Sequence, residues 1–193
     1  MSVQRAFQRL LDTLNVLKIP YMVGGSLASS VHGVFRSTND IDIVANVQEE
    51  HIMPFVSELA GEFYADPDTI REALRQGRPF NVIHFASGYK FDFFPVGGNP
   101  YFQMQLERCS VQEVTIGEGE SIRCSLATAE DIVLAKLAWY RAGGEHSERQ
   151  WKDVRGIQSV QRDRLDQAYM RQWARHLGVN DLLERLFAEE RPA

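Results

Sequence analysis

The sequence lacks several features that would assign a protein class by themselves. It has only two cysteines, Cys109 and Cys124, without a histidine cluster near them, so we expect reduced thiols and no zinc site. No apolar run approaches the roughly 20 residues that a membrane-spanning helix needs. Basic residues are not in excess, because 21 lysines and arginines stand against 26 aspartates and glutamates. The resulting net charge of −5 gives no general attraction for nucleic acid.

Other absences concern the organisation of the chain. We find no internal repeat and no stretch that looks like a disordered linker. The first residues lack the apolar core of a signal peptide, so we expect a cytoplasmic protein. With 193 residues, 44% of them hydrophobic and 24% charged, the composition is typical of a globular protein with one full domain, or a core with a smaller appendage.

The most informative stretch is residues 21–44, which predicts a strand, a glycine turn, a short helix and a second strand. Gly24 and Gly25 favour a turn, because glycine takes positive φ at little cost and lets the backbone approach a ligand closely. Ser26 follows at the expected start of the helix, where a hydroxyl caps free N–H groups. Such a terminus can bind an anion, so the stretch predicts a phosphate site.

The second strand of this stretch, residues 40–44, alternates acidic and apolar side chains. Asp40 and Asp42 therefore share one face, while Ile41 and Ile43 enter the core. A pair of aspartates with this spacing is most often a solvated strand face. Like charges on a largely buried strand, however, cost free energy unless a cation or solvent offsets them. Together with the anion site, the two carboxylates suggest a divalent metal that carries a nucleoside triphosphate.

Two further charged residues stand in apolar surroundings. Asp92 lies in an expected strand, residues 89–96, that forms a hairpin with residues 80–86. A carboxylate among phenylalanines is costly unless it is paired or binds a cation, and the alternative is an exposed strand position.

Lys136 lies in a largely apolar helix, residues 128–140, where a phosphate or a carboxylate would have to compensate its charge. The alternative is a lysine that extends its ammonium group to water.

Periodicity and turn residues supply the remaining elements, with Asp68, Thr128 and Ser147 as expected helix caps. We expect helices over residues 2–17, 26–32, 48–63, 68–75, 101–108, 128–140, 147–159, 163–176 and 180–189, and strands over residues 21–23, 40–44, 80–86, 89–96, 109–116 and 120–126. The fold class is then α/β (α+β), with a mixed, twisted β-sheet and a C-terminal helical extension. We divide the chain into a core, residues 1–126, and a helical region, residues 127–193.

A known signature matches the central stretch. Gly24-Gly25-Ser26, an intervening helix and Arg36-x-Thr38-x-Asp40-Ile41-Asp42-Ile43 together resemble the DNA polymerase beta-type nucleotidyltransferase superfamily. Within it, the stretch is similar to the small bacterial nucleotidyltransferases and to the AbiEii-type toxin nucleotidyltransferases. The resemblance covers residues 20–96 and, more loosely, residues 127–155. It implies a nucleotidyltransferase fold and the Mg²⁺- or Mn²⁺-dependent transfer of a nucleoside monophosphate from a triphosphate to an acceptor hydroxyl in RNA, protein or a small molecule.

The resemblance also implies a role for each candidate residue. Asp40, Asp42 and Asp92 would be the catalytic, metal-binding carboxylates, and Asp92 would help to deprotonate the acceptor. The nucleotide-binding residues would be Gly24, Gly25, Ser26, Arg36, Thr38 and Lys136. The residues alone favour two roles for Arg36 equally, namely a phosphate contact and an ion pair with a neighbouring carboxylate.

Two rival hypotheses remain open. A catalytically silent nucleotide-binding module, or a toxin–antitoxin partner, would keep the fold without turnover, although the three acids favour activity. Lys152 and Asp153 resemble a Lys-Asp element of the toxin-type proteins, but Gly156 stands near the place of their next acid. An antibiotic nucleotidyltransferase would need an acidic pocket for a cationic drug, and acidic residues outnumber basic ones outside residues 141–175. We expect no membrane partner, while the acceptor, an antitoxin partner and the oligomeric state are left open.

Overall fold

A computed structural model describes residues 3–35, 40–116 and 121–189. By their internal contacts, these residues form two compact units. The first lies within Met1–Gly24 and Ser37–Leu126, and the second within Gly25–Arg36 and Ala127–Ala193. Residues 25–36, which we expected in the core, therefore group with the C-terminal helices. The division of the chain into functional domains at residues 126 and 127 stays a prediction.

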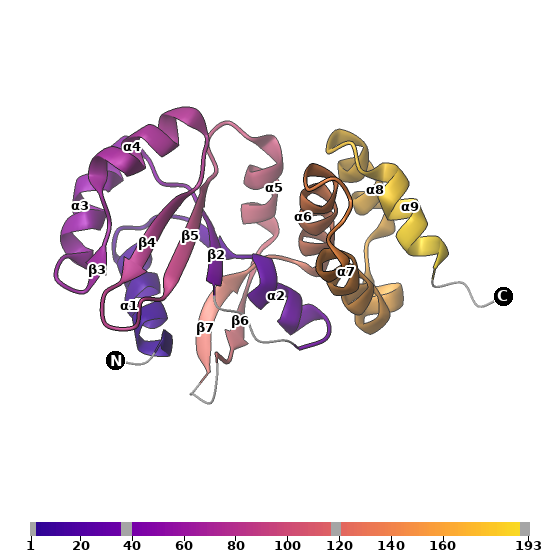
Figure 1. Ribbon diagram of the computed structural model, residues 1–193, viewed down its shortest axis with the longest axis horizontal. Coiled ribbons are helices and arrows are strands. Elements are labelled where there is room, and N and C mark those ends of the chain that lie inside the picture. Colours follow the sequence, from indigo (N-terminus) through magenta and orange to yellow (C-terminus); the bar gives the residue numbers. More distant parts are fainter. Residues whose placement is uncertain (1–2, 36–39, 117–120, 190–193) are drawn as a thin grey trace. The chain divides into compact units, whose positions relative to one another are not determined.

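The described part of the first unit is built on a seven-stranded mixed sheet (Figure 1). Its strands follow the spatial order β3-β4-β5-β2-β1-β7-β6. They are β1 (Tyr21–Val23), β2 (Asp40–Ala45), β3 (Phe63–Tyr64), β4 (Phe80–His84), β5 (Lys90–Pro95), β6 (Ser110–Val114) and β7 (Ile122–Leu126). The pairs β2–β5 and β1–β7 are parallel, and the other neighbours are antiparallel. The mixed sheet that the sequence predicted is thus confirmed.

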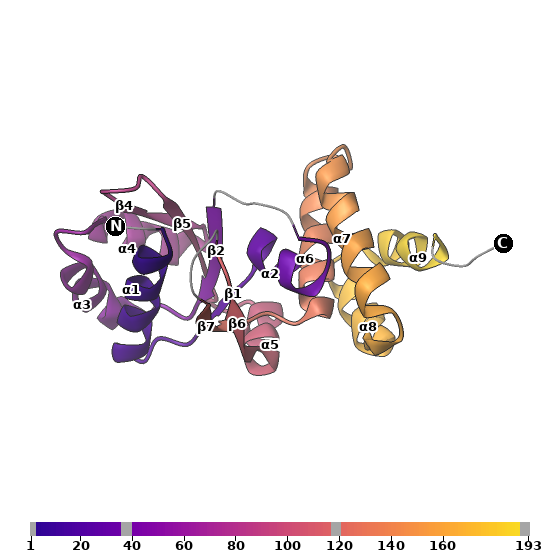
Figure 2. The same ribbon diagram turned by 90° about the horizontal axis from the view of Figure 1, so that it is seen from below.

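The second unit is helical. It comprises α2 (Gly25–His32), α6 (Ala129–Ala142), α7 (Glu148–Gln161), α8 (Gln167–His176), α9 (Asn180–Ala188) and a short 3₁₀ turn (Arg162–Arg164). α6 and α7 lie side by side (Figure 2). The caps expected at Thr128 and Ser147 are confirmed, because Thr128 Oγ1 accepts from the Asp131 N–H at 3.3 Å and Ser147 Oγ accepts from the Gln150 N–H at 3.3 Å.

Two glycines allow α2 to approach α7 within this unit. A Cβ atom at Gly33 would lie 2.8 Å from the backbone nitrogen of Ile157, and one at Gly156 would lie 3.3 Å from Val34 Cγ2. The first distance is shorter than packing allows, and the second is tight. Gly156 therefore has a packing role at the place where the toxin-type pattern has an acid.

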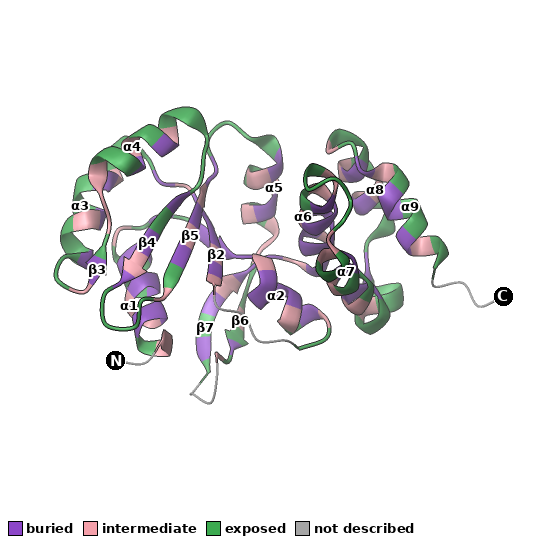
Figure 3. Ribbon diagram, in the orientation of Figure 1, coloured by how far each residue is buried: buried purple, intermediate pink, exposed green. Residues whose placement is uncertain are grey.

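Aromatic side chains form the core between the sheet and the helices of the first unit. Those helices are α1 (Val3–Val16), α3 (Glu49–Leu59), α4 (Pro67–Gln76) and α5 (Pro100–Arg108). Phe7 of α1 stacks on Phe91 of β5, with 6.1 Å between ring centroids, and Phe55 of α3 meets the edge of Phe93 at 5.6 Å. All four rings are fully buried. α3 and α4 keep exposed residues along their outer sides (Figure 3).

The expected helix over residues 48–63 was too long. α3 ends at Leu59, and Gly61 has a φ of +84°, which is the left-handed conformation that glycine favours. Phe63 then pairs with His84 of β4, so the end of the expected helix is a short edge strand instead. Pairing with a strand distant in sequence overrode the helical periodicity here.

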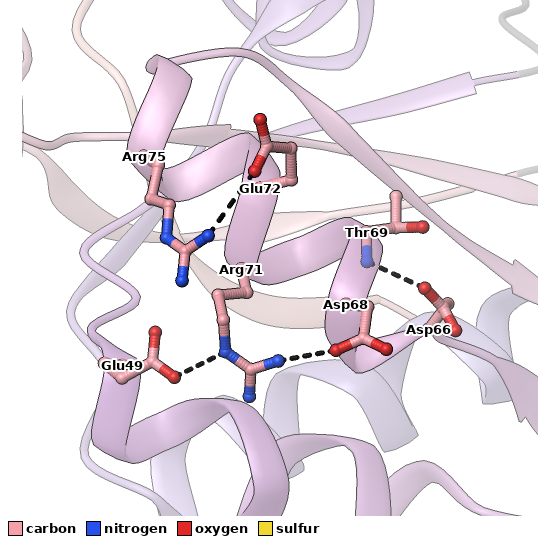
Figure 4. Close-up of polar contacts among 7 residues, drawn as sticks. All are labelled: Glu49, Asp66, Asp68, Thr69, Arg71, Glu72 and Arg75. Atoms are coloured by element: carbon pink, nitrogen blue, oxygen red, sulfur yellow. Dashed lines mark hydrogen bonds and ion pairs between the residues drawn. The ribbon is translucent and has the colours of Figure 1, made fainter.

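The cap of α4 also differs from the prediction. Asp66, not Asp68, is the N-cap, and its carboxylate accepts from the Thr69 N–H at 2.7 Å (Figure 4). Pro67 occupies the first helical position, where a missing N–H costs nothing. Asp68 instead accepts from Arg71 at 2.6 Å, and Arg71 also bonds to Glu49 of α3 at 2.7 Å.

Neither cysteine forms a disulfide, and Cys109 Sγ donates to the Leu106 carbonyl at 3.0 Å. Cys124 is buried in β7, and burial raises the pKa of its thiol to about 11. Its register partner on β6 is Gln112. Within the described ranges, none of the helices combines the length and apolarity that crossing a bilayer demands.

The packing predicts a large difference between two phenylalanines of the first unit. Phe91→Ala removes a fully buried ring and should lower the free energy of unfolding by about 3–5 kcal/mol. Phe85→Ala removes a ring that is 60% exposed and should have little effect. Urea denaturation followed by circular dichroism measures both. Equal effects of the two substitutions would contradict the described core.

Candidate functional site

The register between β2 and β5 brings the three candidate carboxylates to one face of the sheet. The two strands are parallel, with Asp42 opposite Asp92 and Asp40 opposite Lys90. Alternate residues of a strand point to the same side, so these four side chains share a face and the partners Ile41 and Phe91 do not. Given strand spacings of about 4.8 Å and a rise of about 3.3 Å per residue, the three aspartate Cα atoms lie within roughly 8 Å.

Two further side chains hold Asp92. The Lys90 ammonium lies 2.9 Å from Asp92 Oδ2, and the Asn81 amide of β4 donates to Asp92 Oδ1. The Asp92 side chain is only 15% exposed, so these two groups satisfy a carboxylate that is largely removed from water. The hydrogen bond to Asp92 is the largest cause that raises the pKa of Lys90, and the charges of Asp92, Asp40 and Asp42 add to it.

Neither Lys90 nor Asn81 was among the residues selected from the sequence. Both could have been found from the hairpin that Ser87 and Gly88 turn. Its register places Asn81 opposite Asp92 and extends the alternation of β5 back to Lys90. Both residues would have been selected if the expected hairpin had been used to assign which residues of its two strands lie opposite each other.

The carboxylates of Asp40, Asp42 and Asp92 are suitable ligands for a hard divalent cation, and they lie on one face of two neighbouring strands. Three carboxylates supply only oxygen ligands, which Mg²⁺ and Mn²⁺ prefer. In their described conformations, no three His, Cys, Asp or Glu side chains of the described residues are grouped closely enough to hold a metal. The positive charge beside Asp92 is supplied by Lys90.

The diglycine stretch is only partly available for a phosphate. The Gly24 N–H donates to the Asp42 carbonyl at 2.9 Å and so extends the pairing of β1 with β2. This N–H, which we expected to bind phosphate, is therefore already used. Gly25 has the positive φ expected of a glycine turn, +57°, and begins α2. Ser26 follows in the first turn of that helix and is buried. Arg36 and Thr38 lie outside the described residues.

In the second unit, Lys136 is buried with a carboxylate. Its ammonium lies 2.7 Å from Asp153 Oδ2 and 3.4 Å from Gln150 Oε1, and both charged side chains are less than 10% exposed. The sequence left a phosphate and a carboxylate open as the partner of a buried Lys136. In the structure, the Asp153 carboxylate compensates its charge. The neighbouring Asp131 is also buried and accepts from the Tyr169 hydroxyl at 2.5 Å.

The second unit also contains a half-open cavity of about 990 Å³. Its aromatic walls include Phe35, Tyr140 and Trp151. Its charged lining consists of the basic residues Arg149, Lys152, Arg155 and Arg185 and the acidic residues Glu145, Glu148 and Asp153. This lining is mixed rather than acidic, so the cavity does not match the acidic drug pocket considered from the sequence.

Two buried histidines, His84 and His32, make hydrogen bonds within their own units. His84 is buried on the face of β4 opposite Asn81, and its Nδ1 lies 2.8 Å from Ser87 Oγ. His32 Nε2 lies 2.7 Å from the Ala127 carbonyl, and burial lowers its pKa. The carbonyl requires a proton on Nε2, so the neutral ring satisfies this bond.

Comparisons with solved structures identify the fold. A solution structure of the antibiotic-resistance factor ANT(2'')-Ia aligns over 98% of this chain and 96% of its own, with 14% identity and a TM-score of 0.52. A crystal structure of ANT(2'')-Ia in complex with adenylyl-2''-tobramycin aligns over 91% and 98%, with 15% identity and a TM-score of 0.55. An antigenic nucleotidyltransferase-like protein from Paracoccidioides brasiliensis aligns over 96% and 92%, with 17% identity and a TM-score of 0.53.

These similarities confirm the predicted nucleotidyltransferase fold. No protein-family model matches the chain, and no curated protein matches it significantly in sequence. At identities of 14–17%, the likeness extends to the fold alone.

The Lys136–Asp153 pair predicts a strong coupling in stability. Asp153→Asn leaves a buried ammonium without its counter-charge and should lower the free energy of unfolding by about 3–5 kcal/mol. The double variant Lys136→Met with Asp153→Asn removes both charges and should cost less than the sum of the two single variants Lys136→Met and Asp153→Asn. Glu184→Gln, at the more exposed ion pair with Arg171, is the matched control and should change little. Additive effects in the denaturant cycle would contradict the coupling.

Proposed function

We propose that this chain is a nucleotidyltransferase that moves a nucleoside monophosphate from a nucleoside triphosphate to an acceptor hydroxyl. The observation that carries the proposal is the register of β2 and β5, which places Asp40, Asp42 and Asp92 on one face. A nucleotidyltransferase fold around these acids supports it further. One neighbour of this fold was solved with adenylyl-2''-tobramycin, which is the kind of product that such a transfer makes.

In the proposed reaction, Asp40, Asp42 and Asp92 hold Mg²⁺ or Mn²⁺ and orient the reactants. The bound metal would lower the charge on the phosphates and the pKa of the acceptor hydroxyl. Asp92 is the carboxylate proposed to receive the acceptor's proton. The acceptor oxygen forms a bond to the α-phosphorus, the bond from this phosphorus to the β-phosphate breaks, and pyrophosphate leaves.

The proposed nucleotide site comprises Gly25, Ser26, Arg36, Thr38 and Lys136. Lys136 is paired with Asp153 in the structure, so a phosphate would have to compete with this carboxylate or share the ammonium with it. Gly24 contributes through its small size and its bond to Asp42, not through a free N–H. We place the reaction in the cytoplasm, where triphosphates and Mg²⁺ are available and the thiols of Cys109 and Cys124 stay reduced.

The choice of acceptor separates the candidate functions. A hydroxyl-bearing antibiotic is the first small molecule to test, because ANT(2'')-Ia shares the fold. The AbiEii-like stretch supports RNA or protein as the acceptor, together with a toxin role and an antitoxin partner. A silent nucleotide-binding module would bind the triphosphate and label none of these acceptors.

Asp42→Asn should abolish transfer while leaving the fold intact, because it removes a charge from the carboxylate set and nothing from the core. The protein is incubated with each α-labelled triphosphate, Mn²⁺ or Mg²⁺, and total RNA, lysate protein or an aminoglycoside, and the labelled product is counted. Asp12→Asn, at an exposed position of α1, is the matched control and should transfer at the wild-type rate. Unchanged turnover of Asp42→Asn would falsify the proposed role.

A further inference from the structure

The carboxylate face contains a positive charge that the proposed chemistry does not use. Lys90 lies opposite Asp40 in the β2–β5 register and two residues before Asp92 on β5. Its ammonium is 2.9 Å from Asp92 Oδ2. We propose that Lys90 is a tethered counter-ion that offsets part of the negative charge of the carboxylate face in the metal-free protein and competes with a divalent cation for Asp92. This inference rests on the proposed function, because it presumes that the carboxylates are the metal site.

The need for a counter-ion follows from the charges on this face. Three ionised aspartates whose Cα atoms lie within roughly 8 Å on one face repel one another, and a largely buried carboxylate cannot rely on water to reduce the repulsion. Asn81 donates to Asp92 but brings no charge. Lys90 brings one, because its ammonium lies 2.9 Å from Asp92 Oδ2 and its place opposite Asp40 puts it on the face of all three aspartates.

Competition with a metal follows from the atoms that are occupied. Asp92 Oδ1 accepts from Asn81, and Oδ2 accepts from Lys90. A cation that binds Oδ2 therefore competes with the Lys90 ammonium for this oxygen, and the repulsion between the two positive charges favours release of the lysine. Whatever free energy Lys90 gains from this contact then weakens the binding of the metal.

The exposure of Lys90 makes such a displacement feasible. Its side chain is 46% exposed, so the ammonium can move into water without leaving a buried charge behind on the lysine. Lys136 provides the contrast within the same chain, because its side chain is 6% exposed and its pair with Asp153 is closed to solvent. Of these two pairs, that of Lys90 is the one suited to open and close.

The test is the affinity for Mn²⁺ alone, measured by electron paramagnetic resonance of the free ion. Lys90→Gln should bind Mn²⁺ about three- to fivefold more tightly than the wild type, since it removes a competitor held by a half-exposed ion pair. Lys90→Arg keeps the charge and should bind nearly as weakly as the wild type. Lys152→Gln removes an exposed lysine of the second unit and should leave the affinity unchanged.

A second measurement distinguishes a counter-ion from a lysine that only supports the fold. Without metal, Lys90→Gln should unfold at a lower temperature than the wild type, and saturating Mn²⁺ should remove most of this difference. The gain in affinity should vanish when Asp42→Asn is added, because the gain arises at the carboxylates.

The outcomes separate this inference from the proposed function. Unchanged or weaker Mn²⁺ binding by Lys90→Gln overturns the counter-ion, whether or not the wild type transfers nucleotide. Failure of both proteins to bind Mn²⁺ overturns it as well. Tighter binding by Lys90→Gln without transfer to any acceptor supports the counter-ion and contradicts the proposed function.

Discussion

The parallel pairing of β2 with β5 is the interaction on which the candidate site depends. It places Asp42 beside Asp92 and carries Asp40 and Lys90 onto the same face. A shift of this register by one residue would turn one set of side chains to the other face. The aromatic core prevents such a shift, because Phe91 and Phe93 alternate with the charged residues of β5 and are buried against Phe7 and Phe55.

A comparison of Lys136, which is buried, with Lys90, which is half-buried, shows how burial determines whether an ion pair can open. Lys136 and Asp153 are closed to water, so each holds the other in place, and removing one leaves an unpaired buried charge. Lys90 makes a similar bond to Asp92, but its side chain reaches solvent. An ion pair of the second kind costs little to break, which is what a site that exchanges cations requires.

Much of the architecture was predictable from local pattern. The alternation of Asp40 to Ile43 predicted a strand with one acidic face, and residues 89–96 were predicted as a strand in a hairpin with residues 80–86. Thr128 and Ser147 were recognised as caps because a cap depends on residues only three positions away.

The parts that were missed depend on contacts distant in sequence. The bond from Gly24 to Asp42 requires the pairing of β1 with β2, and the strand at Phe63 requires His84. The contacts of α2 with α6 and α7 join segments about a hundred residues apart in the sequence. None of these contacts leaves a signal in a short window of sequence.

The central claim is that Asp40, Asp42 and Asp92 form a metal site that acts with a triphosphate. The most direct test is a crystal grown with Mn²⁺ and a non-hydrolysable triphosphate, examined by anomalous scattering at the manganese edge. The account predicts an anomalous peak within coordination distance of Asp42 and Asp92, with the Lys90 ammonium displaced from Asp92. Triphosphate and manganese bound elsewhere, with Lys90 still on Asp92, would contradict it.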